Sequence, residues 1–159
     1  MVDPVWTEAS VVTWSQLLLD SYHRWTTRQL LPRDGTPVEQ ARRLFSASFV
    51  VVSHGTEADP VLNYGNEVAL TLWEMAWEQF VRTPSRRTAE PAHQAERADL
   101  LRVVEERGYW DQYRGIRISA SGRRFMVEQA TVWNVLDMEG QRVGQAASFS
   151  HWTMLPVQR

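Results

Sequence analysis

A chain of 159 residues has the length of one domain, and its 43% apolar and 23% charged residues are typical of a folded globular protein. The net charge of −2 argues against a protein that works on nucleic acid or on an anionic membrane. The absence of cysteine excludes disulfides, thiolate metal sites and cysteine nucleophiles. No apolar run approaches the roughly 20 residues of a membrane span, and the first residues lack the pattern of a secretory signal. We therefore expect a cytoplasmic protein.

Two features of the composition are unusual. All 17 basic residues are arginine, so Schiff-base chemistry and phosphate-loop nucleotide binding, which both need lysine, are excluded. The chain also has eight tryptophans. A tryptophan is large, rigid and amphipathic, so eight of them suit either a packed core or the wall of a ligand pocket.

The first 46 residues read as two helices. Apolar residues at three- and four-residue spacing over 11–25 form one stripe, which is typical of an amphipathic helix. A loop follows, and Thr36 and Glu39 then have the spacing of a capping box around Pro37. This box predicts a second helix that ends near Phe45.

The next elements are shorter. We expect strands at 49–53 and 61–64, a helix over 67–78 and, after an interruption at Pro84, a helix that opens at Pro91. Asn66 is placed to cap the first of these helices, and Gly108 to end the second.

The last third of the chain has the two-residue period of strands. Turns at 121–122 and 137–140 separate strands at 109–119, 124–136 and 143–155, which predicts an antiparallel meander. One face of the middle strand carries Phe125, Val127, Gln129, Thr131, Trp133 and Val135. We expect that face to pack on the central helices, and the N-terminal helix or a partner subunit to cover the other.

This order of elements resembles a PAS domain. The stretch Leu62–Trp73 resembles the PAS strand-to-helix junction, and Ser121–Phe125 with Glu128 and Leu136–Gly140 resembles the PAS hairpin. The chain resembles more specifically the MEKHLA domain family, in its standalone bacterial form. The supporting stretches are Val52–Gly55, Leu62–Trp73, Pro84–Pro91, Ala130–Leu136 and Phe149–Thr153.

The resemblance implies an α+β fold, a PAS-like antiparallel sheet with helices packed on one face and an N-terminal helical extension. We expect the extension to cover residues 1–46 and the PAS-like domain residues 47–156. PAS domains as a class bind haem, flavin, small metabolites or no ligand, and many of them dimerise. The family supplies no catalytic residues to assign, so the cofactor and any catalytic group stay unknown.

Three polar residues of the meander are the best functional signal. Arg117, Gln129 and Gln145 lie on three successive strands, and we expect them to point into one space. A buried guanidinium needs a partner, which a ligand carboxylate or phosphate would provide. An internal ion pair with Glu90, Asp111 or Glu128 is the alternative.

Further candidates surround the same space. Trp73, Trp77 and Trp133 suit either aromatic pocket walls or ordinary core packing. Tyr64 could present its hydroxyl to the pocket, and Arg86 could contact an anionic ligand or pair with Glu90. None of the four histidines has a partner at metal-ligand spacing, so we predict no metal site.

The leading functional hypothesis is a small-molecule-binding sensory or regulatory module. The first alternative is a small enzyme acting on an anionic or aromatic metabolite in the same pocket, although no serine, histidine or carboxylate pair stands out as catalytic. The second is a dimerisation module with a filled core. We expect a homodimer through the N-terminal helix or the outer sheet face, and no nucleic-acid or membrane partner.

Overall fold

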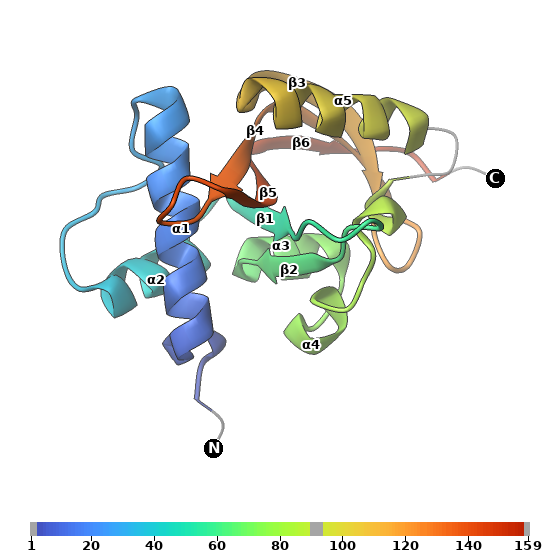
Figure 1. Cartoon of the computed structure of the whole chain (residues 1–159). Helices are drawn as coiled ribbons and strands as arrows, with labels where there is room; N and C mark the ends of the chain where they lie inside the picture. The colour runs from blue at the N-terminus through green and yellow to red at the C-terminus, as the bar shows by residue number, and fades with distance from the viewer. Residues whose placement is uncertain (1–2, 90–93, 158–159) are drawn as a thin grey trace.

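The computed structural model describes residues 3–89 and 94–157 (Figure 1). Its elements in chain order are η1 (Val5–Thr7), α1 (Ala9–Thr26), α2 (Pro37–Phe45), β1 (Val50–His54), β2 (Leu62–Gly65), α3 (Glu67–Trp73), α4 (Trp77–Phe80), η2 (Ser85–Thr88), α5 (Gln94–Arg107), β3 (Tyr109–Ile118), β4 (Arg124–Leu136), β5 (Arg142–Phe149) and β6 (His151–Met154). No helix within these described ranges is long and apolar enough to cross a membrane. The predicted opening of the last helix at Pro91 lies outside the described residues.

The two helix starts that the sequence predicted are confirmed. The Thr36 hydroxyl accepts a hydrogen bond from the Glu39 backbone N–H, and the Asn66 side chain accepts one from the Ala69 N–H. The helix predicted over 67–78 is shorter than expected. It ends at Trp73, because Glu74 adopts a left-handed conformation with φ of 60°, and the separate helix α4 begins at Trp77.

One antiparallel sheet organises the fold. Its strands lie in the order β2-β1-β5-β4-β3, and β6 pairs with the first part of β4. The predicted meander is confirmed, but its last strand is divided at Ser150 into β5 and β6. The long strand β4 therefore has β3 along one edge, and β5 followed by β6 along the other.

Helices cover both faces of the sheet, as Figure 1 shows. The helix α1 and the sheet bury one core, which contains Val11, Leu18, Leu19, Tyr22, Leu31, Leu44, Val51, Tyr64, Trp133, Val135 and Ala146. The opposite face and α3 bury a second core, which contains Val50, Leu62, Ala69, Trp73, Phe80, Phe125, Val127, Ala130 and Phe149. The apolar stripe of α1 is thus buried within its own chain.

The prediction that Phe125 and Trp133 share a face is wrong. Phe125 belongs to the second core and Trp133 to the α1 core. Gln129 lies between them with a positive φ of 54°, and β4 has one more residue than β3 between the pairs Gly115–Val127 and Tyr113–Ala130. An extra residue in one strand reverses the side-chain alternation beyond it. The bulge therefore puts Phe125 and Trp133 on opposite faces of the sheet.

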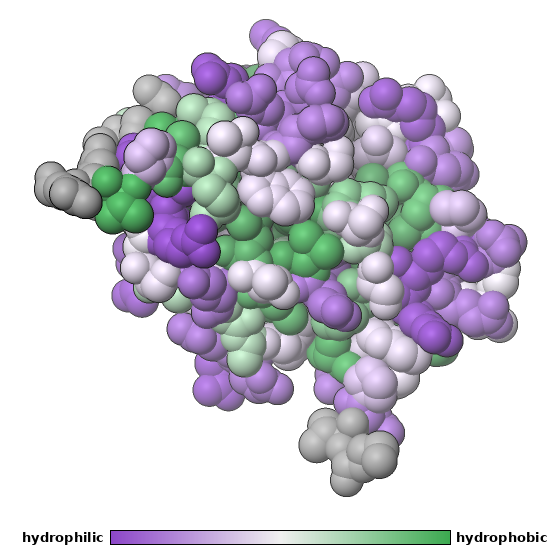
Figure 2. Space-filling model, turned by 180° about the vertical axis from the view of Figure 1, so that it is seen from behind, coloured by the Kyte–Doolittle hydropathy of each residue, from purple (hydrophilic) through white to green (hydrophobic). Residues whose placement is uncertain are grey.

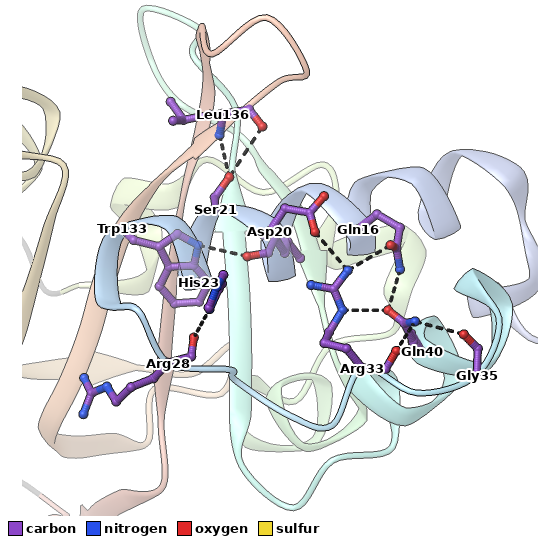
Figure 3. A network of polar contacts seen from close by, with 11 residues as sticks. Gln16, Asp20, Ser21, His23, Arg28, Arg33, Gly35, Gln40, Trp133 and Leu136 are labelled. Carbon is purple, nitrogen blue, oxygen red and sulfur yellow. Dashed lines mark hydrogen bonds and ion pairs between the residues drawn. The ribbon is translucent and has the colours of Figure 1, made fainter.

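Polar contacts fix the N-terminal helices to the sheet and to each other (Figure 3). The Trp133 indole N–H donates to the Leu18 carbonyl at 3.2 Å, and the Leu136 N–H donates to the Ser21 hydroxyl at 2.8 Å. The Arg33 guanidinium donates to Asp20 at 2.9 Å and to the buried Gln40 at 2.7 Å. These bonds join the loop after α1 to α1 and α2.

Candidate ligand pocket between the sheet and the central helices

A partly enclosed cavity lies between the sheet and the elements α3, η2 and α5. The cavity volume is about 70 Å³, which is about the volume that two water molecules occupy in the liquid. Most of its wall is apolar, and Val127, Ala130 and Val132 of β4 form one side. Because the bulge at Gln129 lies between Val127 and Ala130, it is what aligns these three side chains on one face.

Two buried polar atoms on the cavity wall have no hydrogen-bond partner within the part of the chain that the structure describes. They are the indole Nε1 of Trp73 and the amide Oε1 of Gln145, whose residues are 2% and 1% exposed. Other indoles differ, since those of the half-buried Trp14 and Trp25 and of the buried Trp133 all donate hydrogen bonds. A buried polar atom left without a partner costs about 1–3 kcal/mol. A ligand could therefore form hydrogen bonds with the cavity wall at these two atoms.

The other end of the Gln145 amide holds α5 in place. Its Nε2 donates to the Leu101 carbonyl at 3.2 Å, and the neighbouring Asn134 Nδ2 donates to the Val104 carbonyl at 2.8 Å. Asn134 and Gln145 are cross-strand partners on β4 and β5. The two amides therefore attach the second half of α5 to the sheet, and Gln145 also faces the cavity.

Arg117 of β3 supplies a cation to the same cavity. Its guanidinium lies 5.1 Å from the centre of the Tyr113 ring, and no described carboxylate forms an ion pair with it. Of the predicted internal partners, Asp111 pairs with Arg28 and Glu128 with Arg114, whereas Glu90 lies outside the described residues. Burial lowers the pKa of the Arg117 guanidinium, and the neighbouring Tyr113 opposes this effect. An anionic ligand would supply the missing counter-charge.

Of the predicted site residues, Trp73, Arg117 and Gln145 line the cavity. Trp133 and Tyr64 do not, because both are buried in the core on the α1 side. Burial there raises the pKa of the Tyr64 hydroxyl, which keeps it protonated. Trp77 packs edge-on against Tyr64, with ring centres 5.7 Å apart.

The two remaining predicted residues lie away from the cavity. Gln129 is exposed, because its left-handed backbone turns it out of the alternation of β4. Arg86 is also exposed, and it pairs with Asp59 at 3.2 Å. The expectation that Arg117, Gln129 and Gln145 point into one space therefore holds for two of the three.

The sequence analysis missed several polar residues of the wall. His54 of β1 and Ser85 and Thr88 of η2 line the cavity and are buried. The alternation of β1 could have indicated His54, which follows Val50 and Val52 on one face. No local pattern marks Ser85 and Thr88, because η2 is a single short turn placed by the chain around it.

The carboxylate of Glu74 connects the end of α3 to the β3–β4 turn. Glu74 accepts hydrogen bonds from the hydroxyls of Ser119, at 2.6 Å, and Ser121, which join the end of α3 to the β3–β4 turn. These bonds lower the pKa of Glu74 below its ordinary value of 4.5.

Because the folded-state pKa is lowered, the stabilisation from Glu74 is present above about pH 4.5 and is lost as the pH falls through the lowered value. We expect wild type to be more stable than Glu74→Gln at pH 7, and this difference to shrink in acid. Urea unfolding at pH 7, 4.5 and 3 measures it. Glu78→Gln, at an exposed glutamate of α4, is the control. A difference that stays constant with pH would contradict the assignment.

Apolar residues also reach the surface. Figure 2 shows an apolar area in the middle of the rear face, bordered by polar side chains. A surface hollow with apolar walls occurs beside α3 and β6, where Leu72, Trp152 and Met154 contribute. A second hollow, on the outer sheet face beside Phe49 and Gln129, has serine and threonine side chains in its wall as well. Both are more open than the central cavity and lack its buried unpartnered atoms.

The antiparallel order of the strands, the short helices over one face and the cavity beneath them define a PAS-like fold. Solved structures agree. A PAS domain of a protein from Colwellia psychrerythraea superposes with a TM-score of 0.61 at 16% identity, over 69% of this chain and 91% of that chain. A Light-Oxygen-Voltage domain studied with a flavin analogue gives 0.55 at 18% identity, over 74% and 85%. An RNA-binding Light-Oxygen-Voltage receptor gives 0.59 at 15% identity, over 76% of this chain but 33% of that chain.

The chain belongs to the MEKHLA domain family. The family model, described as the MEKHLA domain, matches residues 12–154, and this range includes most of α1 together with all of α2. The resemblance to this family that the sequence analysis found is therefore confirmed. A search among curated proteins gives no match.

The residues of the cavity do not suit the flavin suggested by the second of these structures. The chain has no cysteine to form a covalent flavin adduct. A tricyclic flavin ring is also larger than this cavity, whose volume is about 70 Å³. A ligand of this cavity must be smaller.

Proposed function

We propose that the protein is a small-molecule-binding sensory module whose ligand occupies the cavity between the sheet and α3, η2 and α5. The observation that carries this proposal is the pair of buried, unpartnered atoms, Trp73 Nε1 and Gln145 Oε1, on the wall of one cavity. Buried polar atoms in native proteins almost always have partners. A bound molecule would supply both at once, in a fold that many sensors share.

A route from the ligand to the surface supports the sensory role. Gln145 faces the cavity with its Oε1 and holds the Leu101 carbonyl of α5 with its Nε2. A ligand bonded to the amide oxygen therefore acts on the same group that positions α5. The shift in the position of α5 is limited by the difference in ligand affinity between the two positions.

We include a homodimer in the proposal, formed through the outer sheet face. The apolar stripe of α1 is already buried on its own sheet, so α1 offers little for a partner. The outer face keeps an open hollow beside Phe49, Gln129 and Thr131, with both apolar and polar walls, that a second copy would cover.

The first test is native mass spectrometry of the freshly purified protein, compared with its denatured mass. We expect a reproducible non-covalent adduct, and the same spectrum reports the oligomeric state. Ala147→Leu places a larger side chain on the cavity wall and should remove the adduct. Ala120→Leu makes the same change at an exposed turn and should keep it.

Binding should also stabilise the fold. A ligand present at 100 times its Kd adds about 2.7 kcal/mol, which raises the Tm of a domain of this size by roughly 5–10 °C. A clean native mass, together with no change in Tm across a metabolite library, would contradict the proposal.

A further inference from the structure

The chemistry of the cavity wall narrows the ligand to one class. This step rests on the proposed function and goes beyond it. Three groups on the wall decide the ligand: the Arg117 guanidinium, which has no ion pair with a described carboxylate, the Trp73 indole N–H and the Gln145 Oε1. The two donors require an acceptor on the ligand, the Gln145 oxygen requires a donor, and the cavity volume limits the size of a molecule that carries both.

Arg117 and Trp73 are both neighbours of Phe125. Phe125 is the cross-strand partner of Arg117, and its ring lies 5.2 Å from that of Trp73. An indole N–H can only donate and a guanidinium can only donate, so both groups need an acceptor. A carboxylate has two oxygens and the negative charge that Arg117 lacks among the described residues, and it can receive both donors together.

Gln145 requires a hydrogen-bond donor on the ligand. Its Nε2 donates to the Leu101 carbonyl, so rotating the amide by half a turn would bring two oxygens together. That contact fixes Oε1 as the atom left without a partner, and a carbonyl oxygen accepts only. The ligand must therefore donate a hydrogen bond at this point. A hydroxyl group does so without charge, whereas an ammonium group would bring a second cation into a cavity that already holds Arg117.

We propose that the cavity binds a short-chain hydroxycarboxylate, with the carboxylate on Arg117 and Trp73 and the hydroxyl donating to Gln145. The cavity volume of about 70 Å³ limits the ligand to a chain of a few carbons. Val127, Val132 and the other apolar residues of the wall then contact the carbon chain.

Thermal unfolding with three matched probes tests this assignment. 3-Hydroxybutyrate carries both groups, butyrate only the carboxylate, and 2-butanol only the hydroxyl. We expect 3-hydroxybutyrate at millimolar concentration to raise the Tm by several degrees. Butyrate should bind about tenfold more weakly, since it leaves Gln145 Oε1 unpartnered. 2-Butanol should give no shift.

Two variants test which residue binds each end of the ligand. Arg117→Met should abolish the shift with both carboxylates, and Arg114→Met, at an exposed arginine of the same strand, should preserve it. Gln145→Leu should remove the preference for 3-hydroxybutyrate over butyrate, a change that a purely structural role for Gln145 would not produce. Circular dichroism verifies that each variant is folded.

The outcomes separate this inference from the proposed function. An adduct in the native spectrum that is neutral or aromatic, bound independently of Arg117, overturns the hydroxycarboxylate assignment and leaves the sensory module standing. Equal shifts from 3-hydroxybutyrate and butyrate in wild type also overturn it. A clean native mass with no shift from any probe overturns both.

Discussion

Trp133→Ala should cost about 3–5 kcal/mol of unfolding free energy, the range for removing a large aromatic side chain from a core. Trp133 is 0% exposed and lies edge-on to Tyr22, with ring centres 5.0 Å apart. Its indole also donates to the Leu18 carbonyl in the middle of α1. The substitution therefore leaves a cavity and removes the main contact between the sheet and α1.

Urea unfolding followed by circular dichroism measures the effect. With a slope of about 1–3 kcal/mol per molar urea, we expect the midpoint to fall by roughly 1–5 M. Trp110→Ala is the matched control, because Trp110 is 42% exposed and should cost about 1 kcal/mol or less. If both variants lost the same unfolding free energy, the core between α1 and the sheet would not contribute the stability predicted here.

Asn66→Ala should be destabilising to a similar degree, by about 3–5 kcal/mol. The Asn66 side chain is fully buried, and its oxygen accepts from the backbone N–H groups of Val51 and Ala69. Its nitrogen donates to the carbonyls of Leu44 and Phe49. One amide thus joins the end of α2, the start of β1 and the start of α3, and its loss leaves buried backbone groups unpaired.

A second helix cap provides the comparison. Thr36 caps α2 from an exposed position through one backbone bond, so Thr36→Ala should cost about 1 kcal/mol. Asn66→Asp keeps the two accepting interactions and loses the two donating ones, and it should also be strongly destabilising. If Asn66→Asp were as stable as wild type, the bonds to Leu44 and Phe49 would have no energetic role.

Sequence patterns predicted those parts of the fold whose causes are local. The caps at Thr36 and Asn66 depend on residues three positions apart, and both were found. The break after Trp73 was missed, because Glu74 has no intrinsic preference for its left-handed conformation. Its hydrogen bonds to Ser119 and Ser121, which accompany that break, come from far along the chain.

The candidate site was predicted in part for the same reason. Arg117 and Gln145 follow the regular alternation of their strands and reach the cavity. Gln129 and Trp133 were predicted on the wrong face because β4 contains a one-residue bulge. The sequence does not mark this bulge, since glutamine is not a residue that favours a positive φ. Tyr64 and Trp77 were candidates for the pocket but pack on the α1 side, because local aromatic spacing does not reveal which face of a sheet a neighbouring helix covers.

The bonds between α1 and β4 also determine when the fold can form during synthesis of the chain. Leu18 and Trp133 are 115 residues apart, and a ribosome that adds about 5–20 residues per second needs roughly 6–23 s to make that stretch. During this interval the first helix exists while the strands that bury its apolar stripe do not. The nascent chain therefore exposes a hydrophobic helix face for many seconds, and the fold can close only when the last third of the chain has emerged.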